Sequence, residues 1–432
     1  MAGARDAALR ALIAFRRDGA WPESALKDAL RGMDRREAAL ATRLCNGVLQ
    51  NRMLLDHWLS GFVRGKLQPV VRDILRLAAY QLCFLDRIPP SAAVNEAVEQ
   101  TRRLANQQAA RLVNGVLRNL LRALPLPEPE DLATRYSHPA PLVALLREAC
   151  NNDAELEALL ACDNTPAPLY LQCNTVRTTA QALQAQLEEA GIACQAHPWL
   201  PDCLTVTGAG DLAALASYQA GLFYVQDPAA KLSILCAGLP ESGGNVLDCC
   251  AAPGGKSFAA AIAMGGRGSI VSCDIYPHKT ALIENGAARL GLTNITARQQ
   301  DASQVVPEWV GAMDTVIADV PCSGLGIIRK KPDIRYKNLK ELEDLPALQL
   351  KILEAQASYV RPGGTLLYST CTVLKRENED VVSAFLAAHG GFTTEPLPLP
   401  DVFPKNETGM LTLIPGEYDT DGFFICRLRR KA

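Results

Sequence analysis

Residues 245–256 read NVLDCCAAPGGK, a short apolar run that ends in a glycine turn and a lysine. Four more runs rich in β-branched residues follow it, and helical stretches separate them: SIVSCDI at 269–275, ITARQQD at 295–301, DTVIADV at 314–320 and GTLLYST at 364–370. Strands that alternate with helices predict an α/β fold with a doubly wound parallel sheet. The ligand of such a sheet lies at the carboxyl ends of its strands.

The turn from Cys250 to Lys256 is similar to a phosphate loop, but Cys250 stands where the pattern GxxxxGK[ST] requires a glycine. The dinucleotide pattern GxGxxG is absent as well. What remains is a glycine turn at a helix N-terminus, where backbone N–H groups bind a carboxylate as readily as a phosphate. The sequence therefore disfavours an ATPase.

Two acidic residues close the next two strands. Asp274 follows the second strand and is expected to accept the two hydroxyls of a ribose. Asp301 follows the third strand and is expected to receive an adenine amine. Each acid alone is an ordinary turn residue. A glycine turn, a ribose acid and an adenine acid together predict S-adenosylmethionine as the cofactor.

Cysteines follow the fourth and fifth strands, in PCSG at 321–324 and STC at 369–371. Most of the 14 cysteines lie in apolar runs and are expected to be buried reduced thiols. Cys322 and Cys371 instead lie among glycine, serine and threonine at the expected ligand edge, which favours reactive thiolates. The residues Glu377, Asn378 and Glu379, just beyond, are interpreted as helix-capping residues.

Two thiols beside a methyl donor indicate methylation of a pyrimidine at C5. A thiolate that adds to C6 makes C5 nucleophilic, and a base later removes the C5 proton so that the thiol can leave. One cysteine would be the nucleophile and the other would assist release, and the residues alone leave their order open. Asp319, at the end of the fourth strand, is expected to hydrogen-bond the ring N3 or the amino group.

Residues 1–124 have a helical period and an excess of basic residues. They contain 20 Lys and Arg against 11 Asp and Glu, whereas the remainder contains 24 against 35. Between Thr101 and Arg122 the chain carries five arginines and no acid, which predicts an amphipathic helix with a basic outer face. This asymmetry favours a nucleic-acid partner.

The chain divides by texture into four parts. The helical part covers 1–126, and a linker with connecting helices, opened by the proline-rich PLPEPEDLA at 125–133, covers 127–165. A small α+β subdomain is predicted at 166–237 and the parallel-sheet domain at 238–432.

Several motifs resemble those of the RNA 5-methylcytosine methyltransferases: DCCAAPGGKS at 248–257, CDIYPHK at 273–279, the run DTVIADVPCSGLGIIRKKPDIRY at 314–336 and GGTLLYSTCTVLKRENEDVV at 363–382. The helical part, with RLVNGVLRNLLR at 111–122, resembles a NusB-like RNA-binding domain. This fusion is typical of the bacterial family, of the RsmB (Sun or Fmu) type, that methylates small-subunit ribosomal RNA. The resemblance implies an all-α NusB-like domain, a small α+β RNA-binding subdomain and a Rossmann-like class I methyltransferase domain.

The resemblance also assigns roles to residues. It makes Cys371 the nucleophile and Cys322 the thiol that assists release. It implies that the cofactor is bound by a set of residues in the turn and after the strands: Cys250, Ala251, Ala252, Pro253, Gly254, Gly255, Lys256, Asp274, Asp301 and Asp319. The family usually has an arginine where this chain has Gln172, which leaves an RNA or interdomain contact at that position in question.

The expected protein is a cytoplasmic monomer that acts on a cytosine of small-subunit (16S) ribosomal RNA without a metal and without a membrane anchor. No apolar stretch reaches the length of about 18 residues that a membrane span needs. Three alternatives stay open: the same chemistry on transfer RNA, a non-catalytic RNA-binding or antitermination factor, and a DNA methyltransferase. With no CxxC pair and 5 histidines in the chain, a zinc cluster is disfavoured.

Overall fold

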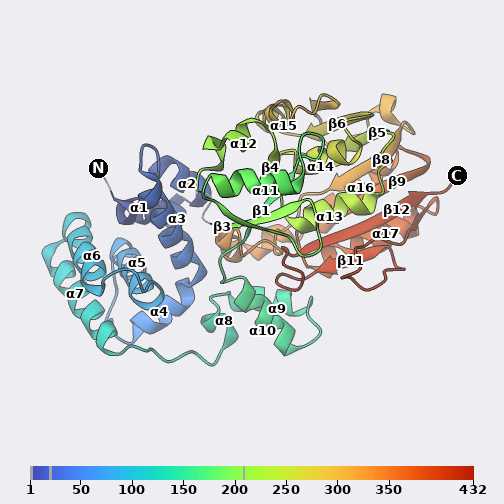
Figure 1. Cartoon of the computed structure of the whole chain (residues 1–432). Coiled ribbons are helices and arrows are strands. Elements are labelled where there is room, and N and C mark those ends of the chain that lie inside the picture. The colour runs from blue at the N-terminus through green and yellow to red at the C-terminus, as the bar shows by residue number, and fades with distance from the viewer. Residues whose placement is uncertain (1–2, 19–21, 208–209) are drawn as a thin grey trace. The chain divides into compact units, whose positions relative to one another are not determined.

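The structure is a computed structural model that describes residues 3–18, 22–207 and 210–432 (Figure 1). The chain forms two compact units. The helical unit comprises Met1–Arg147, Asn152–Thr165 and Lys330–Lys337, and the sheet unit comprises the remainder. The helical unit therefore contains a short segment from the C-terminal half of the sequence.

The helical unit is built from helices, the first seven of which share its main apolar core. They are α1 (Ala4–Asp18), α2 (Pro22–Ala29), α3 (Arg35–Gln50), α4 (Arg52–Ser60), α5 (Pro69–Phe84), α6 (Pro90–Leu104), α7 (Gln107–Arg122), α8 (Leu132–Arg135), α9 (Ala140–Arg147) and α10 (Asp153–Cys162), with a 3-10 turn, η3, at Pro332–Tyr336. The centre of the core is the buried face of α5, where Ile74, Leu75 and Leu77 are at most 1% exposed. The period of 3.6 residues correctly predicted an all-helical N-terminal fold.

The basic stretch that was expected to form one helix is two helices. The chain breaks between α6 and α7, where the side chain of Asn106 caps α7 by accepting from Ala109 N at 2.9 Å. Arg102 and Arg103, at the end of α6, form ion pairs with Glu99 and Asp6.

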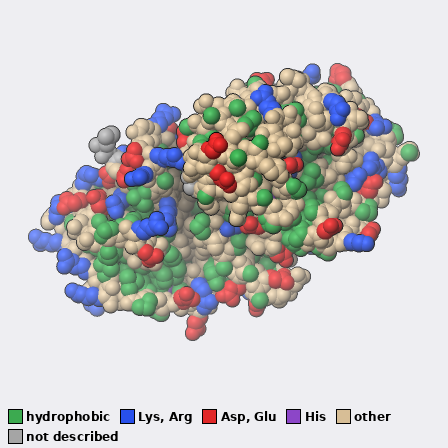
Figure 2. Space-filling model, in the orientation of Figure 1, with side chains coloured by type: hydrophobic (Ala, Val, Ile, Leu, Met, Phe, Trp, Pro, Cys, Tyr) green, Lys and Arg blue, Asp and Glu red, His purple; other side chains and the backbone are tan. Residues whose placement is uncertain are grey.

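Helix α7 carries three of the five exposed arginines of this stretch, and α6 carries the other two. Arg111, Arg118 and Arg122 lie on its exposed side. In Figure 2, Lys and Arg side chains are spread over the surface of the N-terminal helices. The predicted basic outer face is therefore present, but it belongs to α7.

The sheet unit begins with a small antiparallel sheet of order β2-β3-β1-β4. Its elements are β1 (Leu169–Cys173), α11 (Ala180–Glu189), β2 (Ala193–Ala196), β3 (Cys203–Thr207), η1 (Leu212–Ala214), α12 (Ala216–Gln219) and β4 (Phe223–Val225). Helix α11 packs on one face through Leu183 and Leu187, which are fully buried. The α+β character predicted for this region is confirmed.

The large sheet has the order β10-β12-β9-β8-β5-β6-β7, with β11 paired to β12. Its elements are α13 (Pro228–Ala237), β5 (Asn245–Asp248), α14 (Gly255–Ala263), β6 (Ser269–Asp274), α15 (Pro277–Leu290), β7 (Ile295–Gln299), η2 (Pro307–Trp309), β8 (Met313–Asp319), η4 (Leu339–Leu342), α16 (Leu345–Ala357), β9 (Val360–Thr370), η5 (Lys375–Glu377), α17 (Glu379–Ala388), β10 (Phe392–Thr394), β11 (Met410–Leu413) and β12 (Phe423–Arg430). The five strands named in the sequence analysis are parallel, as predicted, and β12 pairs with β9 in the antiparallel direction.

Alternate strand residues face opposite layers of helices. Val246 of β5 packs with the core under α13, α14 and α15, whereas its neighbour Leu247 packs with the core under α16 and α17. The first strand, β5, is followed by β6 and β7 on one side and by β8 and β9 on the other. The order of the strands thus reverses between β5 and β8, which is where ligands bind in such sheets.

Candidate functional site

A cavity of about 180 Å³ lies where the strand order reverses, between the turn after β5 and the end of β8. Of the residues predicted to bind the cofactor, seven line it: Cys250, Ala251, Ala252, Pro253, Gly255, Lys256 and Asp319. The remaining lining residues, which the sequence analysis did not single out, are Val225, Gln226, Ala230 and Asp248. Gln226 follows β4, so the small sheet contributes to the wall.

The glycine turn exposes the start of α14 to this cavity. Gly254 is the N-cap of α14, has φ +113° and offers no side-chain cap. A Cβ at this position would lie 2.3 Å from Cζ of Phe258, so a glycine is required both for conformation and for space. The first-turn N–H groups of α14 are therefore left for a negatively charged ligand.

An ion pair joins the turn to the end of β8. Lys256 Nζ lies 2.6 Å from Asp319 Oδ2, and Ser369 Oγ donates to Asp319 Oδ1 at 2.8 Å. The side chain of Lys256 is 11% exposed and that of Asp319 is 27% exposed. Contacts to both oxygens hold the Asp319 carboxylate in one orientation at the cavity wall.

Asp248 is fully buried beneath the same turn. Its Oδ2 accepts from Ser257 Oγ at 2.7 Å, while its Oδ1 has no hydrogen-bond partner among the described residues. Burial raises the pKa of Asp248 to about 7, against the opposing effects of the Ser257 hydrogen bond and the positive charge of Lys256. The cavity wall therefore holds an acceptor oxygen that no described residue satisfies.

We expect the Asp248→Asn variant to change how stability depends on pH. The pKa of the folded state lies above that of the unfolded state, so the folded protein retains a proton that the unfolded chain has lost. Asp248 therefore lowers the stability as pH rises from about 4 to about 7. Unfolding midpoints measured across this range should show the variant gaining on the wild type as pH rises. Asp401→Asn, at an exposed carboxylate, is the control, and parallel curves for Asp248→Asn and the wild type would refute the assignment.

Asp274 and Asp301 do not line this cavity. Asp274 ends β6, and its Oδ1 accepts from Tyr276 N at 3.0 Å. Asp301 follows β7, and its Oδ1 accepts from Ser303 N at 2.9 Å. Both carboxylates thus stabilise turns at the carboxyl edge of the sheet, and their predicted contacts with ribose and adenine stay predictions.

The two predicted reactive cysteines are in contact. Cys322, after β8, and Cys371, after β9, have their Sγ atoms 3.2 Å apart in a hydrogen bond between thiols. Gly326 N donates to the carbonyl oxygen of Cys371 at 3.0 Å, which joins the two loops through their backbones as well. The geometry therefore places both sulfurs where they can act on one atom.

Buried polar residues support this pair, and the sequence analysis interpreted them as helix caps. Glu377 is fully buried, and its Oε2 accepts from Ser323 N and from Gln349 Nε2, both at 2.9 Å. The side chain of Asn378 accepts from Thr370 Oγ1 at 2.6 Å and donates to the carbonyl oxygen of Thr372 at 3.0 Å. Asn378 is the N-cap residue of α17, but its side chain forms no cap hydrogen bond, and the side chains of both residues bond the cysteine loops instead.

The environment distinguishes the two thiols. The pKa of Cys322 is raised well above its ordinary value by the hydrogen bond with Cys371, by burial and by the negative charge of Glu377. The raised pKa favours the protonated form of Cys322.

These features define a class of protein. A doubly wound sheet with a glycine turn that can bind a carboxylate, next to a pair of thiols at the ends of adjacent strands, is typical of a nucleic-acid methyltransferase.

Comparisons with known proteins give the family. Residues 237–429 match the family described as 16S rRNA methyltransferase RsmB/F, residues 2–122 match the NusB family, and residues 138–213 match the ferredoxin-like domain of RsmF/B-like methyltransferases. The probable ribosomal RNA small subunit methyltransferase B of Bacillus subtilis is 36% identical over 99% of this chain and 98% of its own length. The corresponding protein of Synechocystis is 34% identical over 94% of this chain and 93% of its own length. The chain belongs to the family of ribosomal RNA small subunit methyltransferase B.

Solved structures have the same fold. The crystal structure of PH0851 is 25% identical in sequence. It covers 100% of this chain and 99% of its own length, with a TM-score of 0.80. NSun6 from Pyrococcus horikoshii with SFG is 20% identical and matches 68% of this chain and 98% of its own with a TM-score of 0.61, which supports the fold alone.

The chain is therefore a methyltransferase of small-subunit rRNA, and it uses S-adenosylmethionine. The cavity fits the amino-acid end of that cofactor, because uncapped N–H groups suit its carboxylate and the unpartnered oxygens of Asp248 and Gln226 suit its ammonium group. Among the helices of the described residues, none is long and apolar enough to cross a membrane.

Proposed function

We propose that the enzyme methylates C5 of a cytosine in 16S rRNA through a covalent bond between Cys371 and C6 of the base. The observation that carries this proposal is the 3.2 Å contact between the sulfurs of Cys322 and Cys371. Cys371 lies two residues after Ser369, whose hydroxyl donates to Asp319. The resemblance to the family assigns the nucleophile to Cys371, and the raised pKa of Cys322 supports its role as the protonated partner.

Each residue has a distinct task in the proposed reaction. The sulfur of Cys371 forms a bond with C6, and Asp319 hydrogen-bonds the N3 or amino edge of the ring, which stabilises the adduct. S-adenosylmethionine supplies the methyl group as an electrophile. After the C5 proton has gone to a base, the C6–S bond breaks, and the S–H of Cys322 donates to the departing sulfur.

Within this proposal the turn from Cys250 to Lys256 holds the methionine part of the cofactor. Asp248 and Gln226 join it as acceptors, since both present a buried oxygen without a partner in the described residues. Asp274 and Asp301, at the ends of the neighbouring strands, are assigned to the ribose and the adenine.

The helical unit is assigned to RNA binding. The whole protein is assigned to the cytoplasm, where it acts as a monomer. The exposed arginines of α7 support this, because positively charged side chains on one helix face attract the phosphate backbone. Such contacts position the RNA without reading its sequence.

The experiment that tests the proposal uses the full chain with labelled S-adenosylmethionine and 16S rRNA that lacks modification. We expect label in 16S rRNA as 5-methylcytosine at one position, and much less label in transfer RNA. Label that appears in transfer RNA instead, or at another atom of the base, would contradict the proposal. A chain that binds the cofactor but labels no RNA would indicate the non-catalytic alternative.

A further inference from the structure

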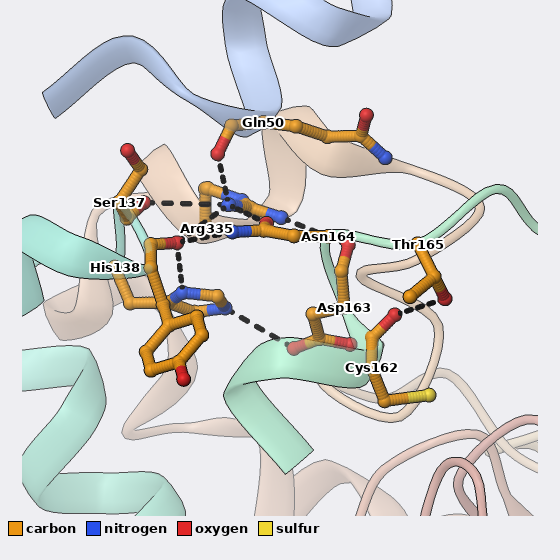
Figure 3. A network of polar contacts seen from close by, with 9 residues as sticks. Gln50, Ser137, His138, Cys162, Asp163, Asn164, Thr165 and Arg335 are labelled. Carbon is orange, nitrogen blue, oxygen red and sulfur yellow. Dashed lines mark hydrogen bonds and ion pairs between the residues drawn. The ribbon is translucent and has the colours of Figure 1, made fainter. Parts of the chain in front are cut away.

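Arg335 is a buried cation in the helical unit, 1% exposed, on the segment Lys330–Lys337 that we call the anchor segment. Figure 3 shows its guanidinium surrounded by oxygen atoms from several stretches of chain. Nη1 donates to the carbonyl oxygen of Gln50 at 2.8 Å and to Asn164 Oδ1 at 2.9 Å. Longer contacts reach three more carbonyl oxygens, those of Tyr136, Ser137 and Asp163.

These oxygens mark the ends of three helices. Gln50 is the last residue of α3, Tyr136 is the C-cap of α8, and Asp163 is the C-cap of α10. The last carbonyl groups of a helix have no partner inside it and carry partial negative charge. One guanidinium with its planar set of donors therefore caps three helices at once.

Neighbouring groups complete the environment of this charge. Asp163 is fully buried, and its Oδ2 lies 3.1 Å from Nε2 of His138. Burial and the positive charge of Arg335 lower the pKa of His138, against the raising effect of its contacts with Asp163 and the carbonyl oxygen of Tyr136. Next to Arg335, Tyr336 OH donates to the carbonyl oxygen of Leu49 at 2.8 Å.

The anchor segment is covalently continuous with the catalytic loop. Arg335 follows Cys322 by 13 residues, and the intervening chain is held in the sheet unit at Ser323 and Gly326. The chain that leaves β8 and carries Cys322 thus continues into the anchor segment, which belongs to the helical unit. Tyr336 also holds the anchor segment in the helical unit, because its ring packs against that of Phe15 with 6.4 Å between the ring centroids.

We propose that Arg335 is a positioning residue for rRNA, because the anchor segment fastens the helical unit to the chain that carries Cys322. This inference rests on the proposed RNA binding by the helical unit. RNA held by that unit meets the thiols as an intramolecular partner, at an effective concentration that depends on how firmly the two parts are joined. A loosened anchor lowers that concentration, while the thiols and the cofactor cavity stay intact.

The test compares two substrates with wild type and Arg335→Ala: 16S rRNA, and a short hairpin that carries only the target cytosine and its neighbours. We expect KM for 16S rRNA to rise by about 10-fold or more, with kcat at saturating RNA within about threefold. On the hairpin, which does not reach the helical unit, both proteins should have the same KM and kcat. Binding of S-adenosylmethionine should be unchanged.

Matched variants separate anchoring from general destabilisation. Arg335→Lys keeps the charge but not the planar set of donors, so its KM for 16S rRNA should lie between those of the wild type and Arg335→Ala. If Arg335→Ala does not fold, Arg335→Lys replaces it in the comparison. Arg361→Ala removes an exposed arginine paired with Asp314 and should match the wild type. An equal loss on both substrates, or no change of KM on 16S rRNA, would overturn the proposal.

Hydrogen exchange tests the anchor without RNA. In Arg335→Lys the amides of the anchor segment and of the end of α10 should exchange faster than in the wild type, whereas those of β5 and β8 should not. Unchanged exchange at those sites would refute the anchor itself. Faster exchange combined with a wild-type KM on 16S rRNA would refute the role in positioning, and a wild type that uses hairpin and 16S rRNA equally well would place the failure in the proposed RNA binding.

Discussion

The Cys322→Ala variant is expected to accumulate a covalent protein–RNA adduct, and the Cys371→Ala variant is expected to form none. Both should lose methyl turnover, by roughly 10³-fold or more for the nucleophile Cys371. Denaturing gels of each variant with labelled S-adenosylmethionine and unmodified 16S rRNA measure this, because only a covalent adduct retains RNA on the protein.

The physical reason is the asymmetry of the two thiols. The contact with Cys371, burial and the charge of Glu377 raise the pKa of Cys322, which favours Cys322 as the protonated partner and Cys371 as the attacking sulfur. Without Cys322, the departing sulfur loses its hydrogen-bond donor, and the adduct forms faster than it breaks down. Without Cys371, the first bond cannot form.

Cys426→Ala is the matched control, since this cysteine is fully buried in β12 away from the cavity. It should leave both turnover and adduct level unchanged. An adduct that accumulates only in Cys371→Ala would reverse the two roles. Turnover in Cys371→Ala that equals the wild type would exclude covalent catalysis by this thiol.

Much of the site could be predicted because its residues follow strands of one parallel sheet. The alternation of strand and helix places the ends of β5, β8 and β9 at one edge, so the glycine turn, Asp319 and the two cysteines had to lie near one another. Periodicity also identified the helical part and the small α+β subdomain.

The residues that sequence reasoning missed interact across long separations. Gln226 reaches the cavity from β4, and Glu377 reaches Ser323 across 54 residues. Arg335 bonds Gln50 across 285 residues. Nothing local distinguishes these side chains from solvated ones, because their partners are mostly backbone atoms that any residue provides. Two local features accompany them, a carboxylate six residues after Cys371 and an arginine between isoleucine and tyrosine in the run PDIRY, but neither identifies the partner.

Replacement of Glu377 by alanine is expected to reduce both stability and activity. The carboxylate is the acceptor for Ser323 N and Gln349 Nε2, and its loss removes two buried hydrogen bonds, although Gln349 Nε2 still donates to the carbonyl oxygen of Pro321. Unsatisfied buried groups of this kind cost about 1–3 kcal/mol each, so we expect the free energy of unfolding to fall by about 3 kcal/mol. We expect kcat to fall by about 100-fold, because Ser323 N is the amide next to Cys322 and a small displacement of a reacting group is costly.

Glu377→Gln separates the charge from the hydrogen bonds. Its amide oxygen can still accept from Ser323 N, so stability should fall less than in the alanine variant, but the negative charge that raises the pKa of Cys322 is gone. The pH at which Cys322 becomes alkylated, measured in the Cys371→Ala background, should therefore shift downward. Glu379→Gln, which alters a carboxylate bonded to Thr412, should not shift it. If Glu377→Gln and Glu379→Gln give the same alkylation profile as the parent, the charge of Glu377 does not act on Cys322, and its role is confined to holding the loop.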